Sequence, residues 1–372
     1  MEPKIRFKGF EGGWKEERLS EISSSIASGK NIDHKGPYPL YGSTGIIGTT
    51  DKPYHEGPML LVARVGANAG FLQLVNEKCG VSDNTLIVKP KDPVTDNYLF
   101  QYFKFFNLNR FIYGSGQPLI TGGMLKKMPV RYGLKEERET LIDYFTSLDS
   151  QISASTSRLA SLKQMKAASL QAMFPQEGET VPKIRFKGFE GEWKKVKVGK
   201  LFSERIENNV DGEMLSVTMN NGIIKAAENG RFDNSNSDKS KYKVVKVGDI
   251  AYNSMRMWQG ASGCSQYEGI VSPAYTVVVP NANIHSLFFA YLFKTIPMIN
   301  LFRLHSQGLT KDTWNLKYPA FSIIEVSYPE SKAEQQAIAT YFTSLDRQIS
   351  LQSQRLEKLK QIKSACLDKM FV

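Results

Sequence analysis

The sequence has few of the residues that bind metals or form disulfides. Among its 372 residues are only three cysteines, Cys79, Cys264 and Cys366, which lie far apart and form no C-x-x-C pair. This spacing argues against a disulfide framework or a zinc knuckle, and it suits a reducing cytosol. The four histidines show no metal-ligand spacing either. We therefore expect neither a metal nor any other cofactor.

Membrane and export signals are also missing from the sequence. No apolar run approaches the roughly 20 residues of a membrane-spanning helix. The charged amino terminus lacks the apolar segment of a signal peptide. The sequence therefore predicts a cytoplasmic protein that contacts no membrane.

The usual catalytic motifs are absent as well. No P-loop of the form Gly-x-x-x-x-Gly-Lys-Ser/Thr occurs, and neither Asn-Pro-Pro-Tyr nor Asp-Pro-Pro-Tyr, as found in amino-methyltransferases, is present. The carboxylates are scattered, and the segment nearest to a nucleophile elbow, Gly114 to Gly116, has the wrong spacing. We predict a chain that binds and does not catalyse.

Positive charge is abundant. The chain has 48 Lys and Arg against 37 Asp and Glu, a net charge of +11 and a pI near 9.3. Clustered basic residues gain affinity for nucleic acids by releasing phosphate counterions. The charge fits a polyanionic partner, although a basic protein without such a partner would look the same.

The clearest positive signal is an internal repeat. Pro3 to Trp14 recurs as Pro182 to Trp193, with one difference in twelve positions and an offset of 179. Tyr144 to Asp149 recurs unchanged as Tyr341 to Asp346, with an offset of 197. Because the offset grows along the chain, the second copy is longer than the first between two closely matched ends. A period this long excludes a solenoid and indicates a duplicated domain with pseudo-two-fold symmetry.

The middles of the two copies resemble each other only faintly. An offset of 190 places Val81 on Val271, and in the same register we expect Gln117 to match Gln307, Leu119 to match Leu309 and Pro129 to match Pro319. Two copies joined only for stability would not explain why the divergence concentrates in the middles. The pattern indicates one shared frame with two different surfaces.

Local patterns indicate mixed α and β structure in each middle. Short apolar runs bounded by Gly, Pro, Asn and Asp predict strands at residues 58–65, 85–88 and 274–279. Aromatic-rich stretches at residues 97–104 and 287–294 follow them with helical spacing. We expect those aromatics to be core residues rather than a platform for stacking bases.

Each copy ends in a predicted long helix. Apolar residues recur at steps of three and four, with Ser155 and Gln352 in the gaps, which is typical of a coiled-coil seam. The residues predicted to pack between the helices are Leu148, Ile152, Leu159 and Leu162 in the first copy and Leu345, Ile349, Leu356 and Leu359 in the second. The 27 residues from Leu148 to Phe174 would span about 40 Å of helix. That length is close to the ~34 Å between DNA half-sites one turn apart.

These observations predict a mixed α/β (α+β) fold of two similar globular domains separated by a pair of long antiparallel helices. The expected boundaries are 1–135 for the first domain, 136–175 for its helix region, 176–181 for a linker, 182–330 for the second domain and 331–372 for its helix region.

The chain as a whole resembles the specificity subunits of type I restriction-modification systems. The resemblance lies in Pro3–Trp14, Pro182–Trp193, Gly248–Ala261, Gly269–Tyr275 and Glu334–Ile338. It implies two target-recognition domains, each reading half of an asymmetric split site in double-stranded DNA. It also implies that the helices act as a ruler and dock two methyltransferase subunits, with restriction subunits supplying ATP-driven translocation and cleavage.

Two other hypotheses compete with this one. A coiled-coil interaction scaffold without sequence-specific DNA binding would need no second, diverged and basic recognition surface. A fragment of a single-chain restriction enzyme would carry catalytic motifs that this chain lacks.

Candidate DNA contacts follow from side-chain chemistry, since Arg, Lys, Asn and Gln pair with base edges and lysines contact phosphates. In the first domain they are Arg64, Asn68, Asn84 and Gln117, with Lys126 and Lys127 on phosphate; in the second they are Asn253, Arg256, Gln259 and Gln307, with Lys311 on phosphate and Trp258 at the groove. The first copy has Ala63 to Gly66 in place of the Met255 to Trp258 segment. We therefore expect no simple transfer of contacts between domains.

Overall fold

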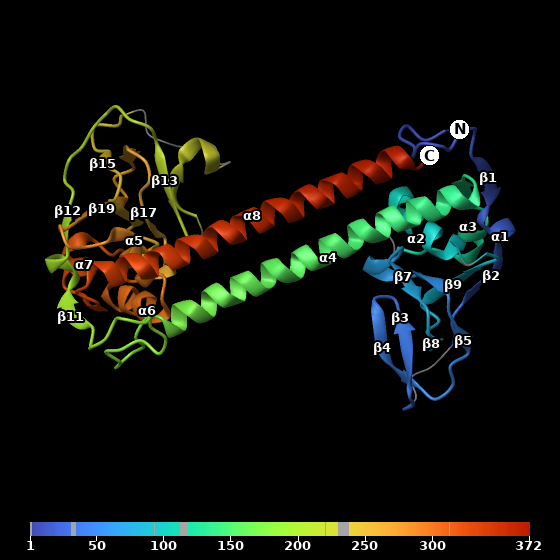
Figure 1. Cartoon of the computed structure of the whole chain (residues 1–372), viewed down its shortest axis with the longest axis horizontal. Coiled ribbons are helices and arrows are strands. Elements are labelled where there is room, and N and C mark those ends of the chain that lie inside the picture. The colour runs from blue at the N-terminus through green and yellow to red at the C-terminus, as the bar shows by residue number, and fades with distance from the viewer. Residues whose placement is uncertain are drawn as a thin grey trace. The chain divides into compact units, whose positions relative to one another are not determined.

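The chain forms two compact units, each built around one copy of the repeat (Figure 1). In this computed structural model the first unit comprises residues 1–157 and 353–372, and the second comprises residues 158–352. The structure describes residues 2–30, 35–92, 94–111, 118–219, 221–229, 238–311 and 313–372. The contacts divide each long helix between the two units, so each unit contains the end of one helix and the beginning of the other.

The elements of the first unit are β1 (Lys15–Arg18), α1 (Leu19–Ile22), β2 (Ser23–Ser28), β3 (Tyr38–Gly42), β4 (Gly45–Thr50), β5 (His55–Glu56), β6 (Met59–Ala63), η1 (Gly66–Asn68), β7 (Leu72–Val75), β8 (Lys78–Val81), β9 (Thr85–Pro90), α2 (Val94–Phe106), η2 (Leu108–Phe111), α3 (Gly122–Lys126) and β10 (Pro129–Tyr132). The long helix α4 (Lys135–Ala172) begins here.

The elements of the second unit are β11 (Lys194–Lys197), η3 (Val198–Lys200), β12 (Phe202–Glu204), β13 (Leu215–Thr218), β14 (Gly222–Lys225), η4 (Ala226–Asn229), β15 (Lys243–Val245), β16 (Ile250–Asn253), η5 (Met257–Gln259), β17 (Ser262–Cys264), β18 (Gly269–Val271), β19 (Tyr275–Pro280), α5 (Ser286–Leu292), α6 (Ile296–His305), α7 (Tyr318–Ser322) and β20 (Glu325–Tyr328). The second long helix, α8 (Lys332–Met370), follows.

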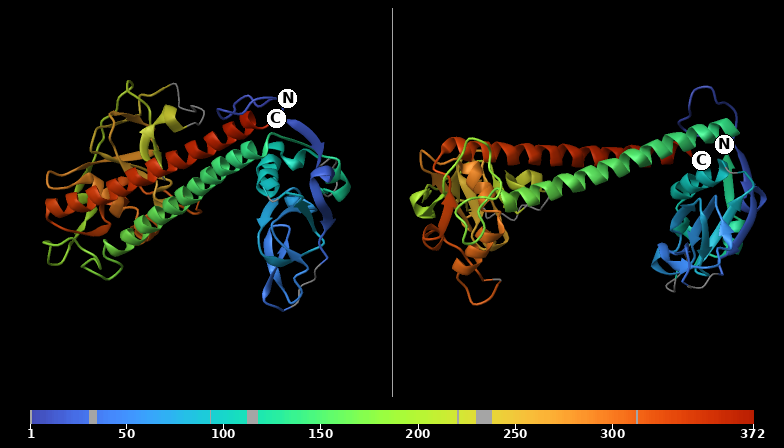
Figure 2. Two further views of the ribbon diagram at one scale, coloured as in Figure 1. Left: turned by 45° about the vertical axis from the view of Figure 1, so that its right-hand side comes forward. Right: turned by 60° about the horizontal axis from the view of Figure 1, so that its bottom comes forward.

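The first unit is built on an antiparallel sheet in the order β2-β9-β6-β7. All five residues of β6 are buried, because this central strand is covered on both faces. One face is covered by α2, and a second sheet, β4-β3-β8-β5, forms the end of the unit far from α2 and α3 (Figures 1 and 2). The predicted strands at 58–65 and 85–88 are confirmed as β6 and β9.

The second unit repeats this plan with the sheet β12-β19-β16-β17. Its central pairing has the register of the first, since Ala63 lies opposite Thr85 and Asn253 lies opposite Tyr275, both at the predicted offset of 190. The strand predicted at 274–279 is confirmed as β19. The mixed fold and the internal duplication are therefore confirmed.

The aromatic-rich stretches form helices whose rings pack into the core, as predicted. In α2 the side chains of Tyr98, Tyr102 and Phe103 are buried, and in α5 those of Phe288 and Phe289 are buried. Within the described residues no single helix is long and apolar enough to cross a membrane. One pair, α5 and α6, passes that test by composition alone, but it is bent by 82°.

The two long helices run antiparallel within each unit. In the first unit the Tyr144 hydroxyl lies 3.3 Å from Cys366 Sγ, and farther along α4 the Asp149 carboxylate accepts a hydrogen bond from Lys363. In the second unit Lys166 Nζ lies 2.5 Å from Asp346 Oδ1. In the first unit the contacting residues have increasing numbers along α4 and decreasing numbers along α8, which confirms the predicted antiparallel pairing.

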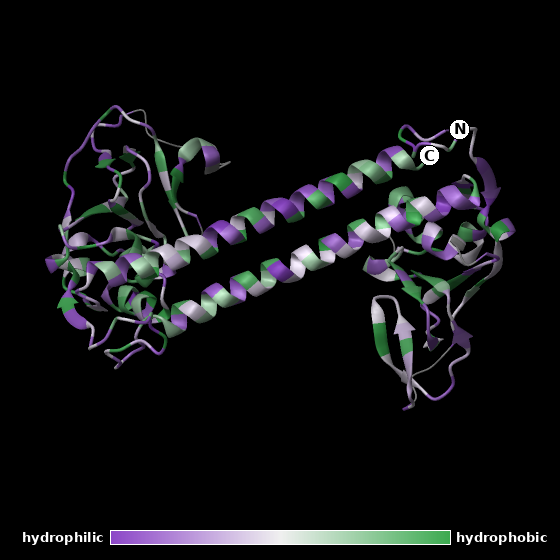
Figure 3. Cartoon of the chain, in the orientation of Figure 1, coloured by the Kyte–Doolittle hydropathy of each residue, from purple (hydrophilic) through white to green (hydrophobic). Residues whose placement is uncertain are grey.

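Apolar and polar residues alternate around both helices, as Figure 3 shows by hydropathy. Among the residues predicted to pack between the helices, the buried ones are Leu148, Leu162, Leu345 and Leu356. The partly buried ones are Ile152, Leu159, Ile349 and Leu359.

The closely matched ends of the repeat bind each globular domain to the long helices. In the first unit Arg6 Nε lies 2.7 Å from Glu137 Oε1, and the indole N–H of Trp14 donates to the same carboxylate. In the second unit Arg185 and Trp193 bind Glu334 in the same way, again with an Arg-to-carboxylate distance of 2.7 Å. Both glutamates are 1% exposed, so these ion pairs are buried and would be costly to break.

The register predicted between the middles holds only in part. Ile120 N–H donates to the Arg64 carbonyl, and Leu316 N–H donates to the Ser254 carbonyl, both at 2.8 Å, so the offset has become 196 by this point. The match of Leu119 with Leu309 is therefore wrong. The match of Pro129 with Pro319 is wrong for the same reason, because the position equivalent to Pro129 in β20 is Glu325. The faint similarity gave no sign of residues inserted after the aromatic helix.

Candidate nucleic-acid interface

Each unit has a turn of the same length after its central strand, here named the β6–β7 loop (residues 64–71) and the β16–β17 loop (residues 254–261). Equivalent hydrogen bonds close them, from Ala63 N–H to the Phe71 carbonyl and from Asn253 N–H to the Ala261 carbonyl. Gly70 and Gly260, which match at the offset of 190, end these turns with φ of +88° and +82°, a left-handed conformation that favours glycine. The first copy therefore has a turn of the same length at this place, but the backbone inside the turn differs, since Gly66 has a φ of +78° and its counterpart Arg256 a φ of −127°. The side chains differ as well, so the expectation that contacts do not transfer simply between the domains stays a prediction.

Polar groups of the β16–β17 loop divide into those that shape it and those that face solvent. Asn253 Oδ1 accepts the Met255 N–H at 3.0 Å, so this oxygen stabilises the turn itself. Arg256 and Gln259 are exposed and lie together, with Arg256 Nη1 donating to Gln259 Oε1 at 3.3 Å. This pair presents guanidinium and amide groups that can form hydrogen bonds with a ligand.

A hairpin, described at residues 307–311 and 313–315 and named here the 307–315 hairpin, lies against the β16–β17 loop. The backbones of Gln307 and Asn315 pair, and the rings of Trp258 and Trp314 pack edge to face with centroids 5.3 Å apart. The exposed Lys311 lies within this hairpin. The second unit thus brings together the two segments that carry the six candidates singled out from its sequence, namely Asn253, Arg256, Trp258, Gln259, Gln307 and Lys311.

In the first unit the structure brings together Arg64, Asn68 and Asn84. Arg64 N–H donates to the Asn84 carbonyl at 2.9 Å, and the hydroxyl of Ser43, in the β3–β4 turn, donates to the same carbonyl at 3.2 Å. Asn68 is exposed in the 3-10 turn of the β6–β7 loop. The Arg64 Nε is buried and has no hydrogen-bond partner within the described part of the chain.

The remaining candidates of the first unit lie elsewhere. Lys126 and Lys127 are exposed at the end of α3, a helix that packs against α1 and β2 (Figure 1). The backbone of the next residue, Met128, accepts a hydrogen bond from Leu19 at the start of α1, so both lysines lie beside α1. Gln117 lies outside the described residues.

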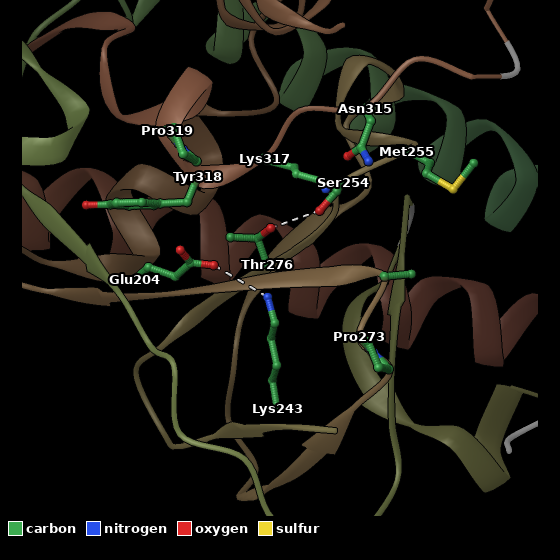
Figure 4. A pocket seen from close by; sticks show the side chains of 11 residues that line it. Glu204, Lys243, Ser254, Met255, Pro273, Thr276, Asn315, Lys317, Tyr318 and Pro319 are labelled. Carbon is green, nitrogen blue, oxygen red and sulfur yellow. Dashed lines mark hydrogen bonds and ion pairs between the residues drawn. The ribbon is translucent and has the colours of Figure 1, made fainter. Parts of the chain in front are cut away.

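A pocket of about 300 Å³ is lined by Ser254 and Met255 of the β16–β17 loop and by Asn315 of the 307–315 hairpin (Figure 4). Glu204 and Lys243 form an ion pair of 3.4 Å on one side of it, and the hydroxyls of Ser254 and Thr276 lie 2.8 Å apart. Asn315 also lines the cavity, and its Oδ1 is buried without a partner in the described residues.

Sequence reasoning missed Lys294, which lies just beyond the end of α5. Its ammonium donates to the carbonyls of Gly260 and Met219. Burial, with the charge of Lys166 adding to it, lowers the pKa of Lys294 to about 8. The available signal was its coincidence with Lys104 at the offset of 190. Among the described residues no group of histidines, cysteines and carboxylates could hold a metal ion.

Comparison with known proteins gives consistent results. A family model described as the type I restriction modification DNA specificity domain matches residues 11–164 and 190–361. A specificity subunit of the Escherichia coli type I restriction enzyme EcoprrI is 26% identical over 159 residues, which are 40% of this chain and 40% of that relative. In that match the chain covers less than half of the relative's length.

Solved structures share the fold. The type I restriction-modification S subunit from M. genitalium matches with a TM-score of 0.66 and 14% identity, covering 100% of this chain and 99% of that one. A chain from a structural study of complex assembly and conformational transition in the type I R-M system matches with a TM-score of 0.50 and 15% identity, covering 97% of this chain and 98% of that one.

The fold, the repeated turn and the matched ends define a duplicated recognition protein with two domains of one design. The family model covers both domains and most of the chain. The chain therefore belongs to the family of type I restriction-modification DNA specificity domains, which confirms the resemblance seen in its sequence.

Proposed function

We propose that this chain reads an asymmetric, split site in double-stranded DNA and recruits the modification and restriction subunits of a type I complex to it. The supporting observation is that the β6–β7 and β16–β17 loops have the same length, are closed by equivalent backbone hydrogen bonds and end in a left-handed glycine, yet present different side chains. Two readers with one frame and different polar groups would recognise two different half-sites. The family match favours this function over a coiled-coil scaffold.

Base reading in the second unit is assigned to the β16–β17 loop and the 307–315 hairpin. Exposed Arg256, Gln259 and Gln307 have the donors and acceptors that discriminate bases in the major groove. Lys311 contacts phosphate, while Asn253 and Trp258 hold the loop against the groove. In the first unit the corresponding readers are Arg64, Asn68, Asn84 and Gln117, and Lys126 and Lys127 contact phosphate beside α1.

The matched ends are assigned to partner docking. Ile5 and Ile184 are repeat equivalents, and both are exposed on the segments that bind the long helices. Met165 of α4 and Ile362 of α8 are also repeat equivalents and are also exposed. Exposed apolar side chains kept in both copies suit two identical partners, here two methyltransferase subunits. Those subunits and the restriction subunits supply catalysis in the cytoplasm, and this chain supplies recognition.

The decisive experiment is co-expression of the full chain with its methyltransferase subunit, followed by genome-wide mapping of methylated adenines. We expect a motif with two different specified halves separated by unspecified bases. A random distribution of methylation, or a continuous motif, would refute the assignment.

Binding to random duplex DNA at increasing salt gives an independent test. Phosphate contacts release counterions, so the logarithm of the affinity should fall linearly with the logarithm of the salt concentration. An affinity that did not change with salt would exclude DNA as the partner.

A further inference from the structure

Lys294 connects two loops that are distant in the sequence. Its Nζ donates to the carbonyl of Gly260, which closes the β16–β17 loop, and at 3.0 Å to the carbonyl of Met219, in the turn between β13 and β14. The side chain reaches both from the end of α5, which packs on β17. One side chain therefore fixes the β16–β17 loop against a neighbouring turn.

An ammonium is chemically suited to this position. An ammonium has three donors and no acceptor, so Lys294 can donate to two carbonyls at once. The Gly260 carbonyl also accepts the Ser262 N–H at 2.9 Å. Charge-assisted hydrogen bonds are about twice as strong as neutral ones. Lys294 is partly buried, and removing it would leave both carbonyls without this donor.

The first unit has a lysine at the same repeat position with different contacts. Lys104 Nζ lies 3.7 Å from the Asp149 carboxylate of α4 and 3.9 Å from the centroid of the Phe100 ring. In the second unit the equivalent carboxylate, Asp346, accepts hydrogen bonds from Lys166 and from the Tyr291 hydroxyl. The duplicated lysine thus faces a long helix in one unit and the β16–β17 loop in the other.

We propose that Lys294 is a positioning residue for DNA reading by the second unit. By holding the Gly260 end of the loop, it determines where Arg256 and Gln259 stand before DNA arrives. A loop whose conformation is fixed before binding loses less conformational entropy when DNA binds. This inference rests on the proposed function, because it assigns DNA reading to that loop.

The structural part of the proposal is tested without DNA by hydrogen exchange on the full chain. In Lys294→Met, amide exchange across residues 254–263 should rise about tenfold or more, while the β19 amides keep their wild-type protection. Lys104→Met is the matched control and should leave residues 254–263 unchanged. Unchanged exchange in the loop of Lys294→Met, or equal acceleration throughout the second unit, would overturn the positioning role. If Lys294→Met does not fold, Lys294→Gln replaces it. Its shorter, uncharged side chain serves at most one carbonyl, so exchange across residues 254–263 should still rise, and unchanged exchange would overturn the positioning role.

The functional part is tested by selection from a pool of duplex oligonucleotides with a randomised segment. Wild type should enrich two half-motifs, and Lys294→Met should lose about tenfold in discrimination in one half, the half that Arg256→Ala also weakens. Lys104→Met should retain both halves. Retention of full discrimination by Lys294→Met, or equal loss in both halves, overturns the proposal. If wild type enriches no motif, the proposed function itself fails, and the exchange experiment still decides whether Lys294 holds the loop.

Discussion

The two units share a four-stranded central sheet, and they differ in the side chains that surround the turn after its central strand. At positions that match at the offset of 190, the rim of the turn carries Arg64 in the first unit and Ser254 in the second. Nearby, Asn84 corresponds to Ala274, which lines the cavity of the second unit. The strand register and the left-handed glycine are the same in both. The side chains available for recognition can therefore differ at single positions while the strand pairing stays the same.

The ends of the units, in contrast, make the same contacts in both copies. Ile5 N–H donates to the Lys369 carbonyl at 3.0 Å, and Ile184 N–H donates to the Ala172 carbonyl at 2.9 Å, so each amino-terminal segment binds the end of a long helix in the same way. The buried Arg–Glu–Trp clusters also repeat. These contacts form the same attachment in both units, and the sequence of the segments that make it is nearly the same in both copies.

The largest expected effect comes from breaking this attachment in one unit at a time. Phe371, at the end of α8, is 3% exposed and packs on Trp14 and Phe145, with ring centroids 6.3 and 5.5 Å away. Its counterpart Phe174 packs on Phe288 at 5.4 Å. Phe371→Ala should destabilise the first unit by about 3–5 kcal/mol, and Phe174→Ala the second by a similar amount. Hydrogen exchange resolved by segment would measure both, and equal destabilisation of the two units by either variant would contradict their independence.

The next effect depends on pH and is confined to the first unit. Asp96, in the first turn of α2, is 2% exposed, and its pKa is raised to about 7 by burial and by the nearby Asp92. Its pKa in the unfolded chain is near 3.8, so the unfolded state releases its proton at a lower pH than the folded state does. The free energy of unfolding of the first unit should therefore fall as the pH rises from about 4 to about 7. Ser286 occupies the equivalent position in the second unit.

Asp96→Ser should therefore stabilise the first unit at pH 8, by at most about 4 kcal/mol from a shift of roughly three pH units, with little gain at pH 4. Urea unfolding at both pH values measures the difference. The reverse change, Ser286→Asp, should create a pH dependence of the same sign but smaller size in the second unit, because Ala282 stands there in place of Asp92. A gain from Asp96→Ser that was equal at both pH values would show that packing, not charge, limits stability there.

The sequence was enough to predict the duplication, the mixed fold and the antiparallel helices, because each leaves a local or periodic signature. Pro3 to Trp14 recurs almost unchanged since its Arg and Trp side chains make the same buried contacts in both units. The core aromatics of α2 and α5 were predictable from helical spacing alone. In these features local pattern and tertiary packing agree.

Other features depend on contacts that no local pattern encodes. The related turns ending at Gly70 and Gly260 were missed because their side chains diverge, and the two copies have in common only the closing backbone hydrogen bonds and one left-handed glycine. The shift of register after the aromatic helix was missed because nothing in the weakly similar sequences marks where residues are inserted between Lys294 and Leu316. The different contacts of Lys104 and Lys294 arise from neighbours far away in the chain, such as Asp149 and Met219.

A smaller effect separates base reading from phosphate contact. Arg256→Ala should cost about 1–3 kcal/mol of discrimination at one position of one half-site, because an exposed guanidinium pairs with a base edge. Lys126→Ala should weaken all sequences about equally and reduce the slope of the salt dependence by about one. Competition binding against single-base variants of the mapped site distinguishes them. An equal loss across all variants for Arg256→Ala would make it a phosphate contact instead.

The smallest effect tests whether the attachment to the long helices responds to acid. Burial alone would raise the pKa of the Asp149 carboxyl, but hydrogen bonds from Lys363 and Gln101 outweigh it, and the pKa lies below its usual 3.8. The ion pairs of Asp149 thus contribute stability above about pH 4 that is lost as the pH falls through the lowered pKa. Because the side chain is 36% exposed, the contribution should stay under about 1 kcal/mol. Asp149→Asn should flatten the acid limb of the first unit's stability curve, measured by urea unfolding from pH 6 to pH 2, and leave the second unit's curve unchanged. A change in both curves would mean that the helix pair transmits the loss from one unit to the other, and the two attachments would then act as one.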